Sequence, residues 1–421
     1  MVFLHRLYEN GRKDKIIMKY INGGVTAAIG FKAAGIHCGI RKNKSKKDLA
    51  LIVSDKKCTA ASVYTTNLVK GAPITVTKKN ISDGYAQAII CNSGNANTCN
   101  ANGIEIAESM CKLVEEYTDI KASDVICAST GVIGQPLDIT PIKNGMKELT
   151  AALGYENSQD AANAIMTTDT KLKEVAVEFT AGGKTCRIGG IAKGSGMIHP
   201  NMATMLVFVT TDCAISSEML NKVVKNDVKD TFNMISVDGD TSTNDMLSVI
   251  ANGMAGNAEI TEENADFEAF TAAFNAVTTA LCKAIAKDGE GASKLLECAV
   301  TGAKDKENAR IIAKSVICSS LVKAAMFGSD ANWGRVLCAI GYSGAEVDIN
   351  KVDVAFVSAK GEIPVCKDGA GIDFSEEKAK EILLEDDIVI KVQLGDGNAA
   401  ATAYGCDLTY EYVKINGDYR T

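Results

Sequence analysis

The chain has 421 residues, of which 46% are hydrophobic and 23% are charged, which are the proportions of an ordinary globular protein. A chain of this length is expected to form two or more structural units. Its formal net charge of −7 and its pI near 5.3 argue against a nucleic acid as partner, because a nucleic-acid-binding face would be basic.

The sequence lacks several features that would indicate a membrane location, export or a metal site. No stretch has the uniform hydrophobicity and length of a membrane span, and none has the architecture of a signal peptide. The 14 cysteines are scattered singly, no C-x-x-C pair occurs, and the chain has three histidines. We therefore expect free thiols in a reducing cytoplasm, no membrane partner, no metal site and no bound cofactor. Met18 precedes the first well-patterned segment, so either Met1 or Met18 can be the start.

In chain order, short apolar runs alternate with helical patterns. Alternation and turn residues predict strands over 48–55 and 87–97, and apolar side chains at helical spacing predict a helix over 104–117. Residues 174–195 alternate around Ala181-Gly182-Gly183 and predict a hairpin. Further helices are predicted over 260–289 and 307–328, followed by strands near 337–342, 352–357, 387–394 and 400–413.

The mixed order of strands and helices predicts an α+β protein, a layered α/β sandwich with a smaller C-terminal α/β region. The boundary between the two regions is expected near residue 300. Neither a low-complexity linker nor a fixed-period repeat interrupts the chain.

Five polar, glycine-containing segments follow strand-like runs. Each alone is typical of a turn, but five in one chain are more than turns require, so we expect them to converge on a pocket. The segments are 92–100, 129–134, 236–245, 288–293 and 328–335. In the second of them, the Thr130 hydroxyl and the backbone N–H of Gly131 are candidate oxyanion-hole donors, because glycine lets a substrate oxygen approach closely.

The segment "KGSGMIHPNMATMLVFV" leads from flexible glycines into an apolar strand that starts at Thr204. Threonine favours strands, so propensity alone explains its place there. The hypothesis we favour is a nucleophile, which needs a base beside its hydroxyl. His199 is the weaker candidate, because Pro200 fixes it in a turn.

The stronger candidate for the base is an α-amine. If the Thr204 hydroxyl attacks the Ala203 carbonyl and water hydrolyses the ester, Thr204 gains an amino group with an ordinary pKa of about 7.7–8.0.

The same segment resembles the autocleavage segment of the ornithine acetyltransferase (glutamate N-acetyltransferase, ArgJ) family. "NSGNAN", "STGVIG", "MTTDT", "SVDGDTSTND" and "ANWGRV" occur in the family's order, and the resemblance runs from residues 21–40 to the C-terminal "DLTYEYVKINGDYRT". It implies the family's α/β sandwich and self-cleavage between Ala203 and Thr204. The products would be an alpha chain, 1–203, and a beta chain, 204–421, two of each forming a heterotetramer.

The resemblance also implies an activity in arginine biosynthesis. Thr204 would take acetyl from N-acetylornithine, release ornithine and pass the acetyl group to glutamate. Thr130 and Gly131 match the family's oxyanion hole. The residues that match substrate-binding positions are Thr167 (with Thr168 as the alternative), Lys193, Thr204, Glu290, Asn416 and Thr421. We expect acetyl-CoA to serve as a second donor; the alternative is an enzyme that uses N-acetylornithine alone.

Two other functions remain open from the residues alone. Autoproteolytic aminopeptidases of similar architecture also cut themselves, but they use serine. A non-enzymatic scaffold has no reason to mature by cleavage, so a denaturing gel separates it from both enzymes.

Overall fold

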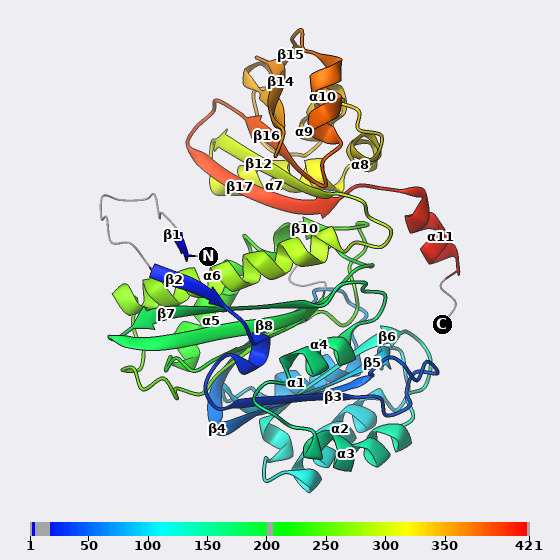
Figure 1. Ribbon diagram of the computed structural model, residues 1–421, viewed down its shortest axis with the longest axis vertical. Helices are drawn as coiled ribbons and strands as arrows, with labels where there is room; N and C mark the ends of the chain where they lie inside the picture. Colours follow the sequence, from blue (N-terminus) through cyan, green and yellow to red (C-terminus); the bar gives the residue numbers. More distant parts are fainter. Residues whose placement is uncertain (1, 5–16, 200–204, 419–421) are drawn as a thin grey trace. The chain divides into compact units, whose positions relative to one another are not determined.

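The computed structural model describes residues 2–4, 17–199 and 205–418. The predicted cleavage site at Ala203 and Thr204, and the predicted binding residue Thr421, therefore lie outside the described residues. The chain forms two compact units, each built on its own sheet (Figure 1). Unit 1 comprises Met1–Gly194, Asn201–Val228 and Ser242–Leu281; unit 2 comprises Ser195–Pro200, Lys229–Thr241 and Cys282–Thr421.

Unit 1 contains a ten-stranded sheet in the order β1-β2-β7-β8-β9-β11-β4-β5-β6, with β3 paired to β4. The β9–β11 and β5–β6 pairs are parallel, and the other neighbours are antiparallel. The strands are β1 (Val2–Leu4), β2 (Ile17–Ile21), β3 (Phe31–Ile36), β4 (Leu49–Tyr64), β5 (Tyr85–Asn95), β6 (Val125–Val132), β7 (Lys173–Ala181), β8 (Lys184–Lys193), β9 (Leu206–Thr211) and β11 (Met246–Ala251).

Helices cover both faces of the β4–β5–β6 part of this sheet (Figure 1). Side chains alternate along β4, so Ile52 packs in a core with α4 while Leu51 packs in a second core with α2 and α3. The helices of unit 1 are α1 (Ala72–Asn80), α2 (Gly103–Tyr117), α3 (Thr140–Ala151), α4 (Ser158–Ile165), α5 (Ser217–Asp227) and the larger part of α6 (Ala265–Lys287), with short 3₁₀ turns η1 (Gly24–Thr26) and η2 (Ala122–Asp124). The predicted layered α/β sandwich is confirmed.

Helix α6 begins later than the predicted 260–289 because Asn264 caps it, its Oδ1 accepting from the N–H groups of Asp266 and Phe267 at 3.0 and 3.1 Å. By length and composition α6 is apolar enough to cross a membrane, although 56% of its most apolar window is buried inside the protein. Its Phe270 ring lies 6.1 Å from that of Phe179 on β7, so α6 packs against the sheet as a core helix.

Unit 2 contains a seven-stranded sheet in the order β10-β17-β12-β16-β13-β14-β15. Its strands are β10 (Ile235–Ser236), β12 (Leu295–Ala303), β13 (Asp353–Ser358), β14 (Gly361–Lys367), β15 (Ala370–Gly371), β16 (Asp387–Gln393) and β17 (Ala399–Cys406). Its helices are α7 (Lys306–Cys318), α8 (Ser320–Phe327), α9 (Trp333–Gly341), α10 (Glu376–Leu383) and α11 (Tyr410–Asp418), with 3₁₀ turns η3 (Phe232–Met234) and η4 (Ile349–Lys351). The boundary expected near residue 300 falls within β12.

Most predicted elements are confirmed, and three predictions of the C-terminal region are wrong. The predicted helix over 307–328 is two helices, because Ser319 adopts an extended conformation and its side chain caps α8 by accepting from Val322 N–H. The predicted strand near 337–342 is helix α9, which Asn332 caps. The predicted strand over 400–413 ends at Cys406, and helix α11 follows.

Candidate active site

Four groups of unit 1 meet at the carboxylate of Asp169, in the segment between α4 and β7. Lys173 Nζ lies 2.7 Å from its Oδ1, and Lys193 Nζ, at the end of β8, lies 4.0 Å from its Oδ2. The backbone N–H groups of Thr167 and Gly194 donate to the same carboxylate at 2.9 and 2.7 Å. Thr167 and Lys193, both predicted to bind substrate, are therefore brought together by a residue that the sequence analysis did not single out.

This cluster is buried and charged. Asp169, Lys173 and Lys193 expose 5%, 2% and 8% of their surface. Burial alone would raise the pKa of Asp169, but the ammonium groups of Lys193 and Lys173, with the hydrogen bonds from Lys173 and from Thr167 N–H, hold that pKa well below its usual range. Asp169 is thus a carboxylate at neutral pH and orients the Lys193 ammonium, whose three donors suit an anionic substrate.

Thr130 and Gly131 lie near the end of β6, beside β5. Gly131 has a φ of 129°, and a Cβ atom there would lie 2.4 Å from the carbonyl carbon of Gly94. Only glycine therefore fits at this position. The β5–β6 ladder also shifts register between Gly94 and Asn95, an irregularity of the kind that re-aims backbone groups near active sites. The local geometry suits the oxyanion-hole role predicted for the pair.

Buried amide side chains hold the backbone just before Thr130. Ser129 Oγ donates to Asn92 Oδ1 at 2.6 Å, and Asn92 Nδ2 donates to the Asn95 carbonyl at 2.9 Å. Asn244, in the segment before β11, adds a third hydrogen bond, in which its Nδ2 donates to the Ser129 carbonyl at 3.0 Å. Three of the five segments predicted to converge on a pocket, 92–100, 129–134 and 236–245, meet at this network, which fixes the position of the candidate oxyanion donors. The other two, 288–293 and 328–335, belong to unit 2.

Two predicted binding residues of unit 2 contact each other. Asn416 Nδ2, on α11, donates to Glu290 Oε2 at 2.9 Å, and the backbone N–H of Glu290 donates to the Ser195 carbonyl at 3.0 Å. A Cβ atom on Gly196 would lie 2.3 Å from the carboxyl carbon of Glu290. Gly196 of "KGSG" therefore makes room for the Glu290 carboxylate.

His199 is held in unit 2 as a neutral, hydrogen-bonded imidazole. Its Nδ1 lies 3.1 Å from Ser236 Oγ and 3.5 Å from Cys318 Sγ, and Thr241 Oγ1 donates to its carbonyl at 2.8 Å. Burial, with the charge of Lys314 second, lowers the pKa of His199 to about 4. These contacts give His199 a structural role in unit 2. The α-amine predicted at Thr204 therefore remains the better candidate for the base.

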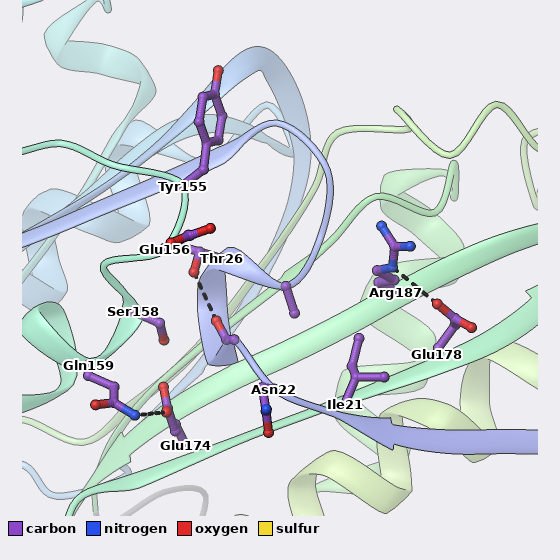
Figure 2. Close-up of a pocket in the computed structure, with 12 residues that line it drawn as sticks. Ile21, Asn22, Thr26, Tyr155, Glu156, Ser158, Gln159, Glu174, Glu178 and Arg187 are labelled. Carbon is purple, nitrogen blue, oxygen red and sulfur yellow. Dashed lines mark hydrogen bonds and ion pairs between the residues drawn. The ribbon is translucent and has the colours of Figure 1, made fainter.

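A separate cavity of about 750 Å³ lies in unit 1 and contains none of the predicted site residues (Figure 2). Its polar lining includes Glu178, whose Oε2 accepts from Arg187 Nε at 3.2 Å, and Glu174, whose Oε1 accepts from Gln159 Nε2 at 2.8 Å (Figure 2). Within the described part of the chain, no group of three or more His, Cys, Asp or Glu side chains could hold a metal ion.

Comparison with known proteins decides the family. The sequence model of the ArgJ family matches residues 32–421. The arginine biosynthesis bifunctional protein ArgJ of Caldanaerobacter subterraneus subsp. tengcongensis is 51% identical over 405 residues, covering 96% of this chain and 100% of that protein. The arginine biosynthesis bifunctional protein ArgJ 1 of Clostridium acetobutylicum is 50% identical over 401 residues, covering 95% of this chain and 98% of that protein. The chain belongs to the ArgJ family.

Membership makes the chain an acyltransferase of arginine biosynthesis. Two solved structures are also similar. The arginine biosynthesis bifunctional protein ArgJ of Bacillus halodurans is 47% identical, with a TM-score of 0.48, and covers 50% of this chain and 98% of that chain. Ornithine acetyltransferase of Mycobacterium tuberculosis, solved in complex with ornithine, is 33% identical, with a TM-score of 0.40, and covers 44% of this chain and 100% of that chain.

Proposed function

We propose that this ArgJ-family enzyme transfers acetyl from N-acetylornithine to glutamate through an acetyl ester on Thr204, and that it also acetylates glutamate from acetyl-CoA. The observation that carries the proposal is the buried Asp169 carboxylate, which holds Lys193 and Thr167 together. The bifunctional names of relatives near 50% identity support the second donor.

Formation of the nucleophile is the first step. The Thr204 hydroxyl attacks the Ala203 carbonyl, the peptide bond is exchanged for an ester, and water hydrolyses the ester. The chain is then cut into residues 1–203 and 204–421, and Thr204 carries both a hydroxyl and a neutral or protonated amine. The neutral amine takes the hydroxyl proton as the hydroxyl attacks an acetyl group.

Acetyl transfer then proceeds in two half-reactions through similar tetrahedral intermediates. Thr130 Oγ1 and the Gly131 N–H donate to the oxyanion, where one donor is worth roughly 10²–10³ in kcat. The Lys193 ammonium binds a substrate carboxylate, and the Glu290 carboxylate, supported by Asn416, binds a substrate ammonium by a charge-assisted bond. We assign Thr167 and Thr421 to substrate binding as well.

We further propose that two alpha and two beta chains form a heterotetramer in the cytoplasm. Support for a reducing compartment comes from the cysteines, because all 14 are free thiols. No metal or cofactor takes part in the proposed reaction; acetyl-CoA enters as a substrate.

An acetyl-donor assay tests the function. Purified enzyme is given glutamate with N-acetylornithine or with acetyl-CoA, and N-acetylglutamate, ornithine and free CoA are measured. Product is expected from both donors, more slowly from acetyl-CoA. Ornithine release without any turnover of acetyl-CoA would assign the alternative, a monofunctional ornithine acetyltransferase. Turnover of neither donor would contradict the proposal.

A further inference from the structure

The loop between β3 and β4 carries a concentration of positive charge that has no role so far. Five of the seven residues from 41 to 47 are lysine or arginine, although the whole chain has a net charge of −7. Lys47 pairs with Asp160, whereas Lys42, Lys44 and Lys46 are exposed and form no ion pair among the described residues. Like charges repel one another, so an unpaired cluster of this kind indicates a surface that meets an anion.

The loop is held in a defined shape by the buried Asp48. The Oδ2 atom of Asp48 accepts from the N–H groups of Gly39 and Arg41, at 3.2 and 3.0 Å. Further along the loop, the Asn43 carbonyl accepts from Lys46 N–H at 3.2 Å. Because the loop is already folded, a ligand that binds its lysines does not have to order the backbone, which lowers the cost of binding.

Arg41 joins this loop to the candidate active site. Its Nη2 donates to the carbonyl of Met166, the residue before Thr167. Its Cγ would lie 2.9 Å from a Cβ atom on Gly94, which stands opposite Gly131 in the β5–β6 ladder. Figure 1 shows the loop beside the ends of β5 and β6. The three exposed lysines follow Arg41 within five residues, a span of at most about 18 Å, so they lie at the rim of this part of the site.

We propose that Lys42, Lys44 and Lys46 bind the phosphate groups of acetyl-CoA. The inference rests on the proposed function, in which acetyl-CoA is the second donor. Acetyl-CoA has its thioester at one end of a long pantetheine arm and its diphosphate and 3′-phosphate at the other. A donor whose acetyl group reaches the active site therefore leaves its phosphates at the rim, and lysine ammonium groups are common ligands of phosphate in proteins.

The other substrates do not account for the cluster. Glutamate and N-acetylornithine carry no phosphate, and their carboxylate is assigned to Lys193, which is only 8% exposed. Salt screens the attraction of exposed charges far more than that of buried ones. The use of acetyl-CoA should therefore fall with ionic strength more steeply than the use of N-acetylornithine.

The test is the triple variant Lys42→Gln/Lys44→Gln/Lys46→Gln, which removes three charges and keeps long polar side chains at exposed positions. The KM for acetyl-CoA is measured in the acetylation of glutamate, and the Kd for CoA is measured by titration calorimetry. Both should rise roughly tenfold, the combined effect of three exposed ion pairs. With N-acetylornithine as donor, kcat and KM should keep their wild-type values, because that donor carries no phosphate.

A donor without phosphates tests the same contact from the side of the ligand. S-acetylpantetheine presents the same thioester on the same arm, so wild type should have a higher KM for it than for acetyl-CoA. The KM for S-acetylpantetheine should be equal in wild type and the triple variant. Added salt should raise the KM of wild type for acetyl-CoA, and should raise that of the triple variant less.

Lys56→Gln/Lys121→Gln/Lys184→Gln is the matched control, because it also removes three exposed lysine charges from unit 1. Lys121 precedes the eight-residue β6, near whose far end Gly131 lies, and Lys184 begins the ten-residue β8, which ends at Lys193. Lys56 lies on β4 beside the start of β5. An eight-residue strand spans about 26 Å, so the control should keep the wild-type KM and Kd.

Several results would overturn the inference. These are wild-type KM and Kd values in the triple variant, an equal rise in the control, or no binding of CoA to the wild type. A parallel rise in the KM for glutamate would also overturn it, because the cluster would then attract anions in general. If wild type binds CoA through the three lysines and yet does not turn over acetyl-CoA, the inference stands and the second donor of the proposed function is refuted.

Discussion

Asp169 shows how one buried residue can serve both stability and substrate binding. Because its pKa is depressed in the folded state, its contribution to stability is present above the unfolded pKa of about 3.9 and is lost as the pH falls through the folded pKa. The same charge fixes the Lys193 ammonium. Loss of Asp169 should therefore weaken the fold and the binding site together, and the loss of stability should depend on pH.

Asp169→Asn is expected to lower the free energy of unfolding by about 3–5 kcal/mol at pH 7, because Lys173 keeps its charge in the interior without its partner. Urea unfolding of variant and wild type at a series of pH values measures this. The difference should shrink as the pH falls below about 4, because the carboxyl of Asp169 then takes up a proton in the unfolded chain before it does so in the folded protein.

Asp160→Asn is the matched control for a surface pair. Asp160 pairs with Lys47 at the surface, the two side chains being 45% and 34% exposed. Its loss should cost at most about 1 kcal/mol at any of these pH values. Equal effects of the two substitutions would contradict the assignment of Asp169 as the anchor of the cluster.

The end of β6 makes a prediction at the level of an element. In Gly131→Ala, the new methyl group would clash with the β5 backbone at Gly94, so the strand end must shift and carry its N–H away from the oxyanion. Acetyl-transfer kcat should fall by roughly 10²-fold or more. Gly134→Ala is the control in the same segment: its φ is 79°, and a Cβ atom would meet nothing within 4 Å. It should cost about 1–2 kcal/mol of stability and keep its kcat.

Elements with a clear period could be predicted from the sequence, and capped or short ones could not. The β7–β8 hairpin followed from alternation around two glycines, which adopt φ values of 56° and 69°. The predicted strand is instead helix α9 because "VLCAIG" is apolar throughout, and a short apolar run does not reveal its period. The break between α7 and α8 depends on the Ser319 cap, and serine also occurs within helices.

The candidate site residues likewise fall into two groups, those that sequence motifs reveal and those that only the folded structure reveals. Thr130, Gly131, Thr167, Lys193, Glu290 and Asn416 lie in motifs that can be recognised in the sequence, and the structure places Thr167 beside Lys193's partner and Glu290 beside Asn416. Asp169 was missed although it lies within a quoted motif. An aspartate in a polar segment is ordinarily solvated, and only folding reveals that this one is buried.

For the whole molecule, self-cleavage gives the most direct prediction. Wild-type protein should run on a denaturing gel as two chains, residues 1–203 and 204–421, with threonine at the second N-terminus. Thr204→Ala removes the attacking hydroxyl, so that variant should remain one chain, folded but inactive. Thr204→Ser keeps a hydroxyl and loses the methyl group that restricts its rotamer, so it should cut partly and retain reduced activity.

Gel filtration distinguishes assembly from cleavage in the same three proteins. If the two units fold before the cut, uncut Thr204→Ala should have the native size of the processed wild type, with two intact chains in place of two alpha and two beta chains. Thermal unfolding should confirm that the variant is folded, because a single substitution of this kind typically costs about 1 kcal/mol of stability. An uncut Thr204→Ala enzyme with full acetyl transfer would disprove the acetyl-threonine mechanism, since no hydroxyl would remain to carry the acetyl group.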